Sequence, residues 1–310
     1  MATAVEHRGD LSARGRGRSV FWHARQPFVP ALKAVLRGWG MVTASRRPMP
    51  GFLLIGAKRG GSTSIYRNLV ATPGVAPLFP RSAQIKATYY FDVEYERGPR
   101  WYRSHFATSR ARAAGPDLNG APALTGEASP YYLSHPHAAR RAATLLPDAR
   151  IIVALRDPVH RAHSHFRERT LQGIETLPTF AEALAAEPSR LAGEWERMLE
   201  DPSYISAPHL NFGYQAQSEY DRGLRCWLAA YPREQVLILR SEDYYLDERA
   251  TLTELRRFLG LAPVALPEPR HYNDTGTGDL DPGLEADLRA RLRPSVERLE
   301  LLVGRPFGWS

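Results

Sequence analysis

Three short and mostly apolar runs are spaced widely along the chain. They cover residues 52–56, 151–155 and 235–239, and each is followed directly by a segment rich in charged residues. Runs of this length without polar alternation are typical of strands that are buried on both faces of a parallel sheet. We therefore predict three parallel β-strands at these positions.

Helical periodicity fills the intervals between these runs. Apolar residues recur with helical spacing over 64–70, 136–146, 158–171, 179–199, 216–230 and 248–259. Strands that alternate with helices imply a parallel sheet with right-handed crossovers. The pattern predicts an α/β fold of three layers, with a central parallel sheet flanked by helices. The segments 109–123 and 262–283, which are rich in proline and glycine, are expected to be loops.

The first 48 residues differ from the rest of the chain. They carry many arginines but only two acids, Glu6 and Asp10, and residues 1–27 have the composition of a disordered segment. Apolar residues then recur at helical spacing over 28–39. Two interpretations remain open for this helix, one on a membrane surface and one docked on the domain. We expect residues 1–48 to form a basic arm and 49–310 to form one domain.

Composition narrows the class of protein. The 310 residues are 43% hydrophobic, yet no run is long enough for a transmembrane helix, and the first 20 residues lack the apolar core of a signal peptide. A single cysteine, Cys226, excludes a disulfide framework and a cysteine-based metal site, so a cytoplasmic location is expected. The formal net charge of +8 favours anionic partners.

The segment that follows the first apolar run has the chemistry of an anion-binding loop. Gly60 and Gly61 permit a tight turn and close backbone approach, and the next helix would present its N-terminus. Hydroxyls and cations surround this point, from Lys58, Arg59, Ser62, Thr63 and Ser64. The loop departs from the Walker A motif, because Ser62 stands where that motif has lysine. Magnesium-dependent nucleotide hydrolysis is therefore disfavoured.

The second apolar run also ends in a candidate binding turn. It delivers Arg156 to the carboxyl end of a strand, which is where ligands bind in open α/β sheets. Asp157 and Pro158 then begin a helix that carries Ser164 about two turns further on. An arginine and a serine that converge in this way suit a phosphate group. The nearby histidines are poorly spaced for metal binding, and no metal site is expected.

Residues 52–69 and 151–166 together resemble the two donor-binding motifs of the sulfotransferases that use 3′-phosphoadenosine 5′-phosphosulfate. The likeness is to the carbohydrate branch, which includes the heparan sulfate sulfotransferases and bacterial relatives, and it extends over about residues 50–310. It implies a P-loop-like fold, with Arg59 as the basic catalytic residue. The donor-binding residues that it implies are Lys58, Arg59, Gly60, Gly61, Ser62, Thr63, Ser64, Arg156, Ser164 and Arg270.

Residues 85–106 resemble the stretch of the same family that carries a catalytic lysine and a general base. Lys86 matches the lysine, but the family's glutamate position is occupied by Ala87. Glu127 is our first candidate for the missing base, and Asp92 and His165 are others. A structural or acceptor-binding role for Glu127 remains an equal alternative.

The resemblance predicts a sulfotransferase that moves a sulfuryl group to a hydroxyl or amine. The expected partner is a carbohydrate-like or other small-molecule acceptor, with no metal and no nucleic acid, and with a weak membrane-surface contact through the N-terminal arm. Two other classes stay open, a nucleotide-dependent kinase or NTPase and a non-catalytic module that binds anionic ligands. Ala87 supports the second of these.

Overall fold

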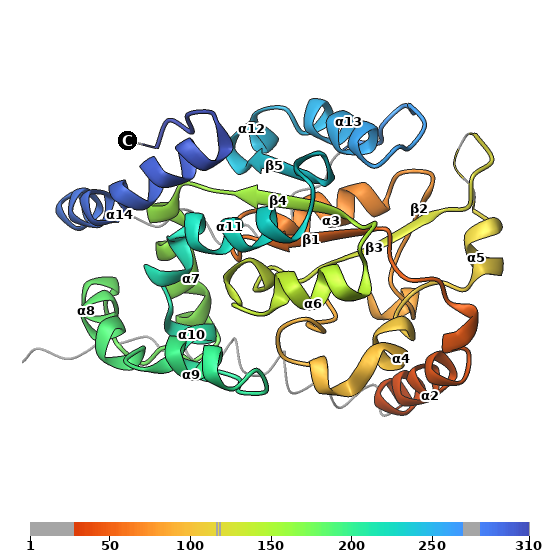
Figure 1. Ribbon diagram of the computed structural model, residues 1–310, viewed down its shortest axis with the longest axis horizontal. Coiled ribbons are helices and arrows are strands. Elements are labelled where there is room, and N and C mark those ends of the chain that lie inside the picture. Colours follow the sequence, from red (N-terminus) through yellow and green to blue (C-terminus); the bar gives the residue numbers. More distant parts are fainter. Residues whose placement is uncertain (1–27, 116, 118, 269–279, 310) are drawn as a thin grey trace, which may run out of the picture.

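The computed structural model describes residues 28–115, 117, 119–268 and 280–309. At its centre lies a parallel sheet in the order β2-β3-β1-β4-β5, with helices packed against both faces (Figure 1). The strands are β1 (Phe52–Gly56), β2 (Val75–Ala76), β3 (Leu124–Ala128), β4 (Arg150–Leu155) and β5 (Val236–Arg240). The predicted α/β fold class is confirmed, and the three predicted strands correspond to β1, β4 and β5.

The predicted helical segments also form helices, with three differences. The segment 216–230 begins as a 3₁₀ helix over Ala216–Ser218 and becomes an α-helix only from Tyr220. The segment 179–199 is divided into two helices at Gly193, which adopts a left-handed φ of 73°, and part of the expected loop 109–123 is a short helix that Thr108 caps. The helices are α2 (Phe28–Val42), α3 (Ser62–Val70), α4 (Gly98–Arg103), α5 (Ser109–Ala113), α6 (Ala138–Leu145), α7 (Pro158–Leu171), α8 (Phe180–Arg190), α9 (Glu194–Glu200), α10 (Ala207–Phe212), α11 (Tyr220–Ala230), α12 (Ser241–Leu246), α13 (Glu248–Phe258) and α14 (Pro282–Val303).

The strand β1 separates two hydrophobic cores. Leu53 and Ile55 point to the side that is covered by α6, α11 and α14. Phe52 and Leu54 point to the other side, which α3 and α13 cover. All four side chains are fully buried, and burial of each contributes about 1.5–3 kcal/mol. Because both faces of β1 are buried, the strand is held rigidly in the sheet. The loop that follows its carboxyl end therefore starts from a fixed position.

Helix α2 is docked on the domain through its polar side. The guanidinium of Arg37 donates hydrogen bonds to the Phe79 carbonyl at 3.1 Å and to the Ser104 carbonyl at 2.8 Å. Figure 1 places the helix beside α4, at the opposite end of the molecule from α14. Among the described helices, none has both the length and the apolar content that crossing a bilayer requires. The predicted disorder of residues 1–27 lies outside the described residues.

Candidate active site

The loop after β1 is fixed by the neighbouring strand β4 and by the start of α12, which follows β5. The Ala57 amide donates a hydrogen bond to the Ala154 carbonyl of β4 at 2.7 Å. The Ser241 hydroxyl at the start of α12 donates to the Gly60 carbonyl at 2.7 Å. The carboxyl ends of β1, β4 and β5 are therefore joined around one loop, at the edge of the sheet where α/β proteins bind ligands.

Two glycines are required by the geometry of this loop. A Cβ atom on Gly60 would lie 2.5 Å from the Ala154 carbonyl oxygen, which is closer than real Cβ contacts allow. Gly61 has a left-handed φ of 81° and precedes Ser62, the first residue of α3. Backbone N–H groups in the first turn of a helix have no intrahelical acceptor and attract anions. The start of α3 is therefore suited to a phosphate or sulfate group.

Arg59 connects the loop with helix α7. Its Nε donates a hydrogen bond to the Ser164 hydroxyl at 3.0 Å, and its Nη1 forms an ion pair with Glu168 Oε1 at 3.0 Å. The backbone of Arg59 is left-handed, with a φ of 67°. Two residues that the sequence predicts to bind the same donor, Arg59 and Ser164, are thus in direct contact.

Lys58 is held under helix α10. Its Nζ donates a hydrogen bond to the Leu210 carbonyl at 3.1 Å. Burial and, after it, the positive charge of Arg169 lower the pKa of Lys58 to about 6, although Glu168 opposes the shift. At neutral pH the amine is therefore mostly uncharged in this state of the protein.

Lys86 approaches the same loop from the other side. Its Nζ lies 3.4 Å from the Ser62 hydroxyl, to which it donates. Burial lowers the pKa of Lys86 to about 8, and the charge of Glu168 is the strongest influence in the opposite direction. The Ala128 amide of β3 donates to the Lys86 carbonyl at 2.7 Å, which fixes the backbone beside Ala87. The predicted Lys86 therefore lies at the anion-binding loop.

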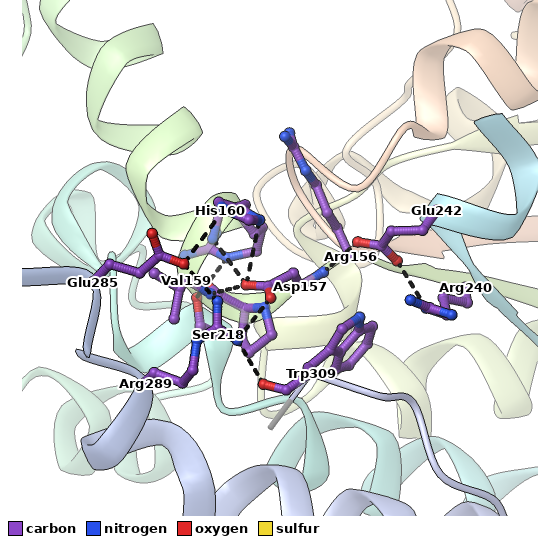
Figure 2. A network of polar contacts seen from close by, with 12 residues as sticks. Arg156, Asp157, Val159, His160, Ser218, Arg240, Glu242, Glu285, Arg289 and Trp309 are labelled. Carbon is purple, nitrogen blue, oxygen red and sulfur yellow. Dashed lines mark hydrogen bonds and ion pairs between the residues drawn. The ribbon is translucent and has the colours of Figure 1, made fainter. Parts of the chain in front are cut away.

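Arg156 directly follows β4, in a turn that other elements hold in place. Asp157 caps α7 by accepting hydrogen bonds from the Val159 and His160 amides. Its second oxygen pairs with Arg289 of α14 at 2.9 Å, as Figure 2 shows. The Arg156 side chain points away from this network (Figure 2). Contact of its guanidinium with a 3′-phosphate stays a prediction, and Arg270 lies outside the described residues.

Glu127 is a fully buried carboxylate near the carboxyl end of β3. One of its oxygens accepts hydrogen bonds from the amide and hydroxyl of Thr88 and from the Ser129 hydroxyl, at 2.7 to 2.8 Å. The other accepts from the Tyr132 hydroxyl at 2.9 Å. These contacts give Glu127 a structural role, and its action as a general base stays a prediction.

The two other candidate bases are also buried. Burial raises the pKa of Asp92 to about 8, and one of its oxygens has no hydrogen-bond partner among the described residues. Burial and the charge of Lys58 hold the pKa of His165 well below its ordinary value. Among the described residues, no cluster of acidic, histidine or cysteine side chains is arranged to hold a metal ion.

Sequence reasoning did not single out Glu168 as a functional residue. It lies one helical turn after Ser164 on α7, so both side chains project from the same face of the helix. The spacing of four residues from a donor-binding serine was the signal that was available in the sequence. The structure brings this acid into the cluster of cations that Arg59 and Arg169 help to form.

Comparison with known proteins agrees with this geometry. Residues 50–269 match a family that is described as the sulfotransferase domain. The membrane-associated sulfotransferase kil1 of Dictyostelium discoideum is 26% identical, over 84% of this chain and 66% of its own length. Human heparan sulfate glucosamine 3-O-sulfotransferase 3B1 is 26% identical, over 92% of this chain and 71% of its own length.

A mouse relative is longer and carries two activities in its name. The bifunctional heparan sulfate N-deacetylase/N-sulfotransferase 2 is 28% identical over 69% of this chain, which corresponds to 22% of its own length. The chain thus spans about two thirds of the Dictyostelium protein and about a fifth of the mouse protein. A crystal structure of a sulfotransferase from Alicyclobacillus acidocaldarius superimposes with a TM-score of 0.66 at 26% identity, over 84% of this chain and 99% of that chain.

Proposed function

The chain belongs to the sulfotransferase domain family, and from this premise we propose that it transfers a sulfuryl group from 3′-phosphoadenosine 5′-phosphosulfate to a hydroxyl or amine of a carbohydrate-like acceptor. The observation that carries the proposal is the contact between Arg59 and Ser164, which joins the loop after β1 to the helix after β4. The donor carries negative charge at both the 3′ and the 5′ position of its ribose. It therefore needs two anion-binding sites that lie close together.

The chain's own residues suit the two anionic groups of the donor. The tight turn at Gly60 and Gly61 and the first turn of α3 form a cradle for the 5′-phosphosulfate, which Ser62, Thr63 and Ser64 line with hydroxyls. We assign Arg156 and Ser164 to the 3′-phosphate, because both follow β4 at the same sheet edge. An arginine and a hydroxyl form charge-assisted hydrogen bonds with such a group.

The reaction that we propose is an in-line displacement at sulfur. The acceptor oxygen or nitrogen forms the new bond, while the bond between sulfur and the bridging oxygen of the 5′-phosphate breaks. Positive charge near the bridging oxygen stabilises the negative charge that develops there, and Arg59 is our candidate for this role. Lys86 would neutralise the sulfuryl oxygens, and Lys58 would assist at the phosphate. The chain's part in the reaction is positioning and charge stabilisation.

The acceptor class is the part of the proposal that depends on the relatives. Two of them are named as sulfotransferases of heparan sulfate. One name specifies transfer to nitrogen and the other transfer to the 3-hydroxyl of glucosamine. We therefore propose a glycan or a glycan-like small molecule as the acceptor. The cytoplasmic location expected from the sequence stays a prediction.

A donor-dependent transfer assay tests the proposal. Purified protein is incubated with radiolabelled 3′-phosphoadenosine 5′-phosphosulfate and with heparan sulfate, N-deacetylated heparosan or a phenol as probe acceptors. We expect label in at least one acceptor and release of 3′-phosphoadenosine 5′-phosphate. Thermal stabilisation by ATP with magnesium, but not by 3′-phosphoadenosine 5′-phosphate, would instead favour a kinase or NTPase. The sequence disfavours that class, because Ser62 stands where the Walker A motif has lysine. Binding of the bisphosphate without transfer to any probe would favour the non-catalytic module.

We also propose that α2 makes a weak contact with an anionic membrane surface. Val35, Trp39 and Val42 are 67%, 58% and 70% exposed, and their spacing places them along one face of the helix. Arg46 and Arg100 are exposed at its C-terminal end, where Arg100 donates to the Met41 carbonyl at 3.3 Å. An apolar stripe beside cations fits a bilayer that contains acidic lipid.

Flotation with vesicles tests this contact. We expect binding to vesicles of phosphatidylcholine mixed with phosphatidylserine, weaker binding to phosphatidylcholine alone, and a loss in the variant Trp39→Ser. Leu301→Ser is the matched control, because Leu301 is 84% exposed on α14 at the other end of the molecule. Equal behaviour of the two variants would contradict the proposal.

A further inference from the structure

We propose that Glu168 is the general base that takes the acceptor's proton, in place of the acid that is missing at position 87. The inference rests on the proposed sulfuryl transfer. It starts from the sequence, where Ala87 follows Lys86, and from an acidic side chain that a different element brings to Arg59 in the loop after β1. That element is α7, which also supplies Ser164.

Glu168 contacts Arg59, the residue that we assign to the bridging oxygen of the donor. Its Oε1 lies 3.0 Å from Arg59 Nη1, and its Oε2 lies 3.5 Å from Arg169 Nη2. The side chain of Glu168 is 23% exposed, whereas Glu127 is completely buried among its hydrogen-bond donors. A ligand can therefore reach the carboxylate of Glu168 without any rearrangement of the strands.

The electrostatic influence of Glu168 extends to the segment that lacks the family's acid. Among the charged groups that act on Lys86, Glu168 has the largest effect, and it acts in the direction that raises the pKa of the amine. The carboxylate also raises the pKa of Tyr89, after the larger effects of burial and of Asp92. Lys86 and Tyr89 lie on either side of Ala87 in the chain. Glu168 and Lys86 thus meet at the same loop, where Glu168 pairs with Arg59 and Lys86 donates to the Ser62 hydroxyl.

The ion pair with Arg59 explains how the acid would be kept in place and then used. Arg59 neutralises Glu168 in the donor-free protein. When the donor is bound, the guanidinium turns to the bridging oxygen of the phosphosulfate, and the carboxylate becomes available to the acceptor. The acceptor oxygen then forms its bond to sulfur, its proton goes to Glu168, and the electron pair of the broken sulfur–oxygen bond stays on the departing 5′-phosphate. Solvent later removes the proton from Glu168.

The groups around Glu168 come from three elements. Arg59 and Lys58 belong to the loop after β1, Arg169 is the neighbouring residue on α7, and Lys86 and Tyr89 belong to the segment before β3. Four of these five groups are basic. The two that form ion pairs with the carboxylate, Arg59 and Arg169, hold it beside the loop after β1.

The variant Glu168→Gln tests the inference, with Glu254→Gln as a matched control on the exposed side of α13. We expect transfer to the probe acceptors to fall by about 10²–10⁴-fold in Glu168→Gln. Binding of 3′-phosphoadenosine 5′-phosphate, measured by calorimetry, should be unchanged or tighter, because Arg59 loses its competing partner. In a second variant, Glu168→Ala, added formate should restore part of the lost transfer.

Each result separates the inference from its rivals. Transfer by Glu168→Gln at the rate of the control would overturn it. A parallel loss of transfer, bisphosphate binding and thermal stability, without rescue by formate, would show that the pair with Arg59 is only structural. If the wild-type protein binds the bisphosphate but transfers label to no probe, the proposed function fails first and this inference fails with it.

Discussion

Arg59 Nε donates a hydrogen bond to the hydroxyl of Ser164 at 3.0 Å, although 105 residues separate the two positions. The contact exists because β1 and β4 are neighbours in the sheet and run in the same direction. Their carboxyl ends therefore meet, and the residues that follow each strand face a common space. The order of the strands therefore brings Arg59 and Ser164 together in the absence of any ligand.

Replacement of Arg59 by alanine is expected to abolish most of the transfer. Loss of one charge-stabilising donor in a transition state costs about 10²–10³-fold in rate. The fold should stay intact with some loss of thermal stability, because the Arg59 side chain is only 11% exposed and loses its hydrogen bond to Ser164 and its ion pair with Glu168. Radiolabel transfer and a melting curve measure the two effects. Arg225→Ala, at an exposed position on α11, is the control, and an active Arg59→Ala protein would contradict the assigned role.

Arg156→Ala is expected to weaken the recognition of the 3′-phosphate in particular. A charge-assisted hydrogen bond contributes about 1.5–3 kcal/mol, so affinity for the bisphosphate should fall about 10–100-fold. Wild-type protein should bind adenosine 5′-phosphate, which lacks the 3′-phosphate, more weakly than the bisphosphate. The variant should bind the two nucleotides with similar affinity in calorimetry. An equal loss for both nucleotides would assign Arg156 to another part of the donor.

Glu127→Gln is expected to destabilise the fold more than it changes the chemistry. The carboxylate accepts hydrogen bonds from Thr88, Ser129 and Tyr132. An amide presents an N–H₂ group to some of these donors, and each buried group that loses its partner costs about 1–3 kcal/mol. Denaturant unfolding should show the loss relative to Glu254→Gln. Full stability with abolished transfer would instead identify Glu127 as the general base.

The parts of this fold that sequence predicts well are those with uniform surroundings. The strands β1 and β4 are apolar at nearly every position because both faces are buried. Such a run can be recognised from the local sequence alone, without knowledge of the strands that pair with it. The strand β3 was not predicted, since its sequence contains Thr125, Gly126 and Glu127. An acid inside a strand is tolerated here because Thr88 and Tyr132 donate hydrogen bonds to its carboxylate, and Thr88 comes from 39 residues away in the chain.

The candidate site also contains residues that the sequence predicts and contacts that it does not. Its glycines and Arg59 follow from the chemistry of a loop after a strand, and Ser164 follows from the resemblance. The partners of these residues depend on distant contacts. The carbonyl of Leu210 holds Lys58 from 152 residues away, and Glu168 meets Arg59 from 109 residues away. No local pattern in the sequence specifies such pairs, which arise when the helices pack against the sheet.

Donor binding is expected to be accompanied by uptake of protons. Burial and Arg169 lower the pKa of Lys58 from 10.5 to about 6, so its amine is mostly neutral at neutral pH. A phosphate group beside it favours the charged form and raises that pKa. Binding of the bisphosphate should therefore draw in protons, and affinity should fall as pH rises from about 6 to about 8. Calorimetry in buffers of different ionisation enthalpy measures the number of protons directly.

Lys58→Met separates the contribution of this residue from that of Lys86, whose pKa is lowered by burial to about 8. Proton uptake should decrease in Lys58→Met, and the part that remains belongs to Lys86.

The variant Lys58→Met should also change how the stability of the protein depends on pH. The pKa of Lys58 is lower in the folded state than in the unfolded state, so unfolding of the wild-type protein takes up a proton between about pH 6 and pH 10. The wild-type protein therefore loses stability as pH falls through this range. Lys58→Met should melt at a higher temperature than wild type at neutral pH, with a difference that shrinks as pH approaches 10 and is level below about 6. A variant that melts lower than wild type throughout, with unchanged proton uptake, would show that Lys58 is charged in the free protein and that its contact with Leu210 is an ordinary ammonium hydrogen bond.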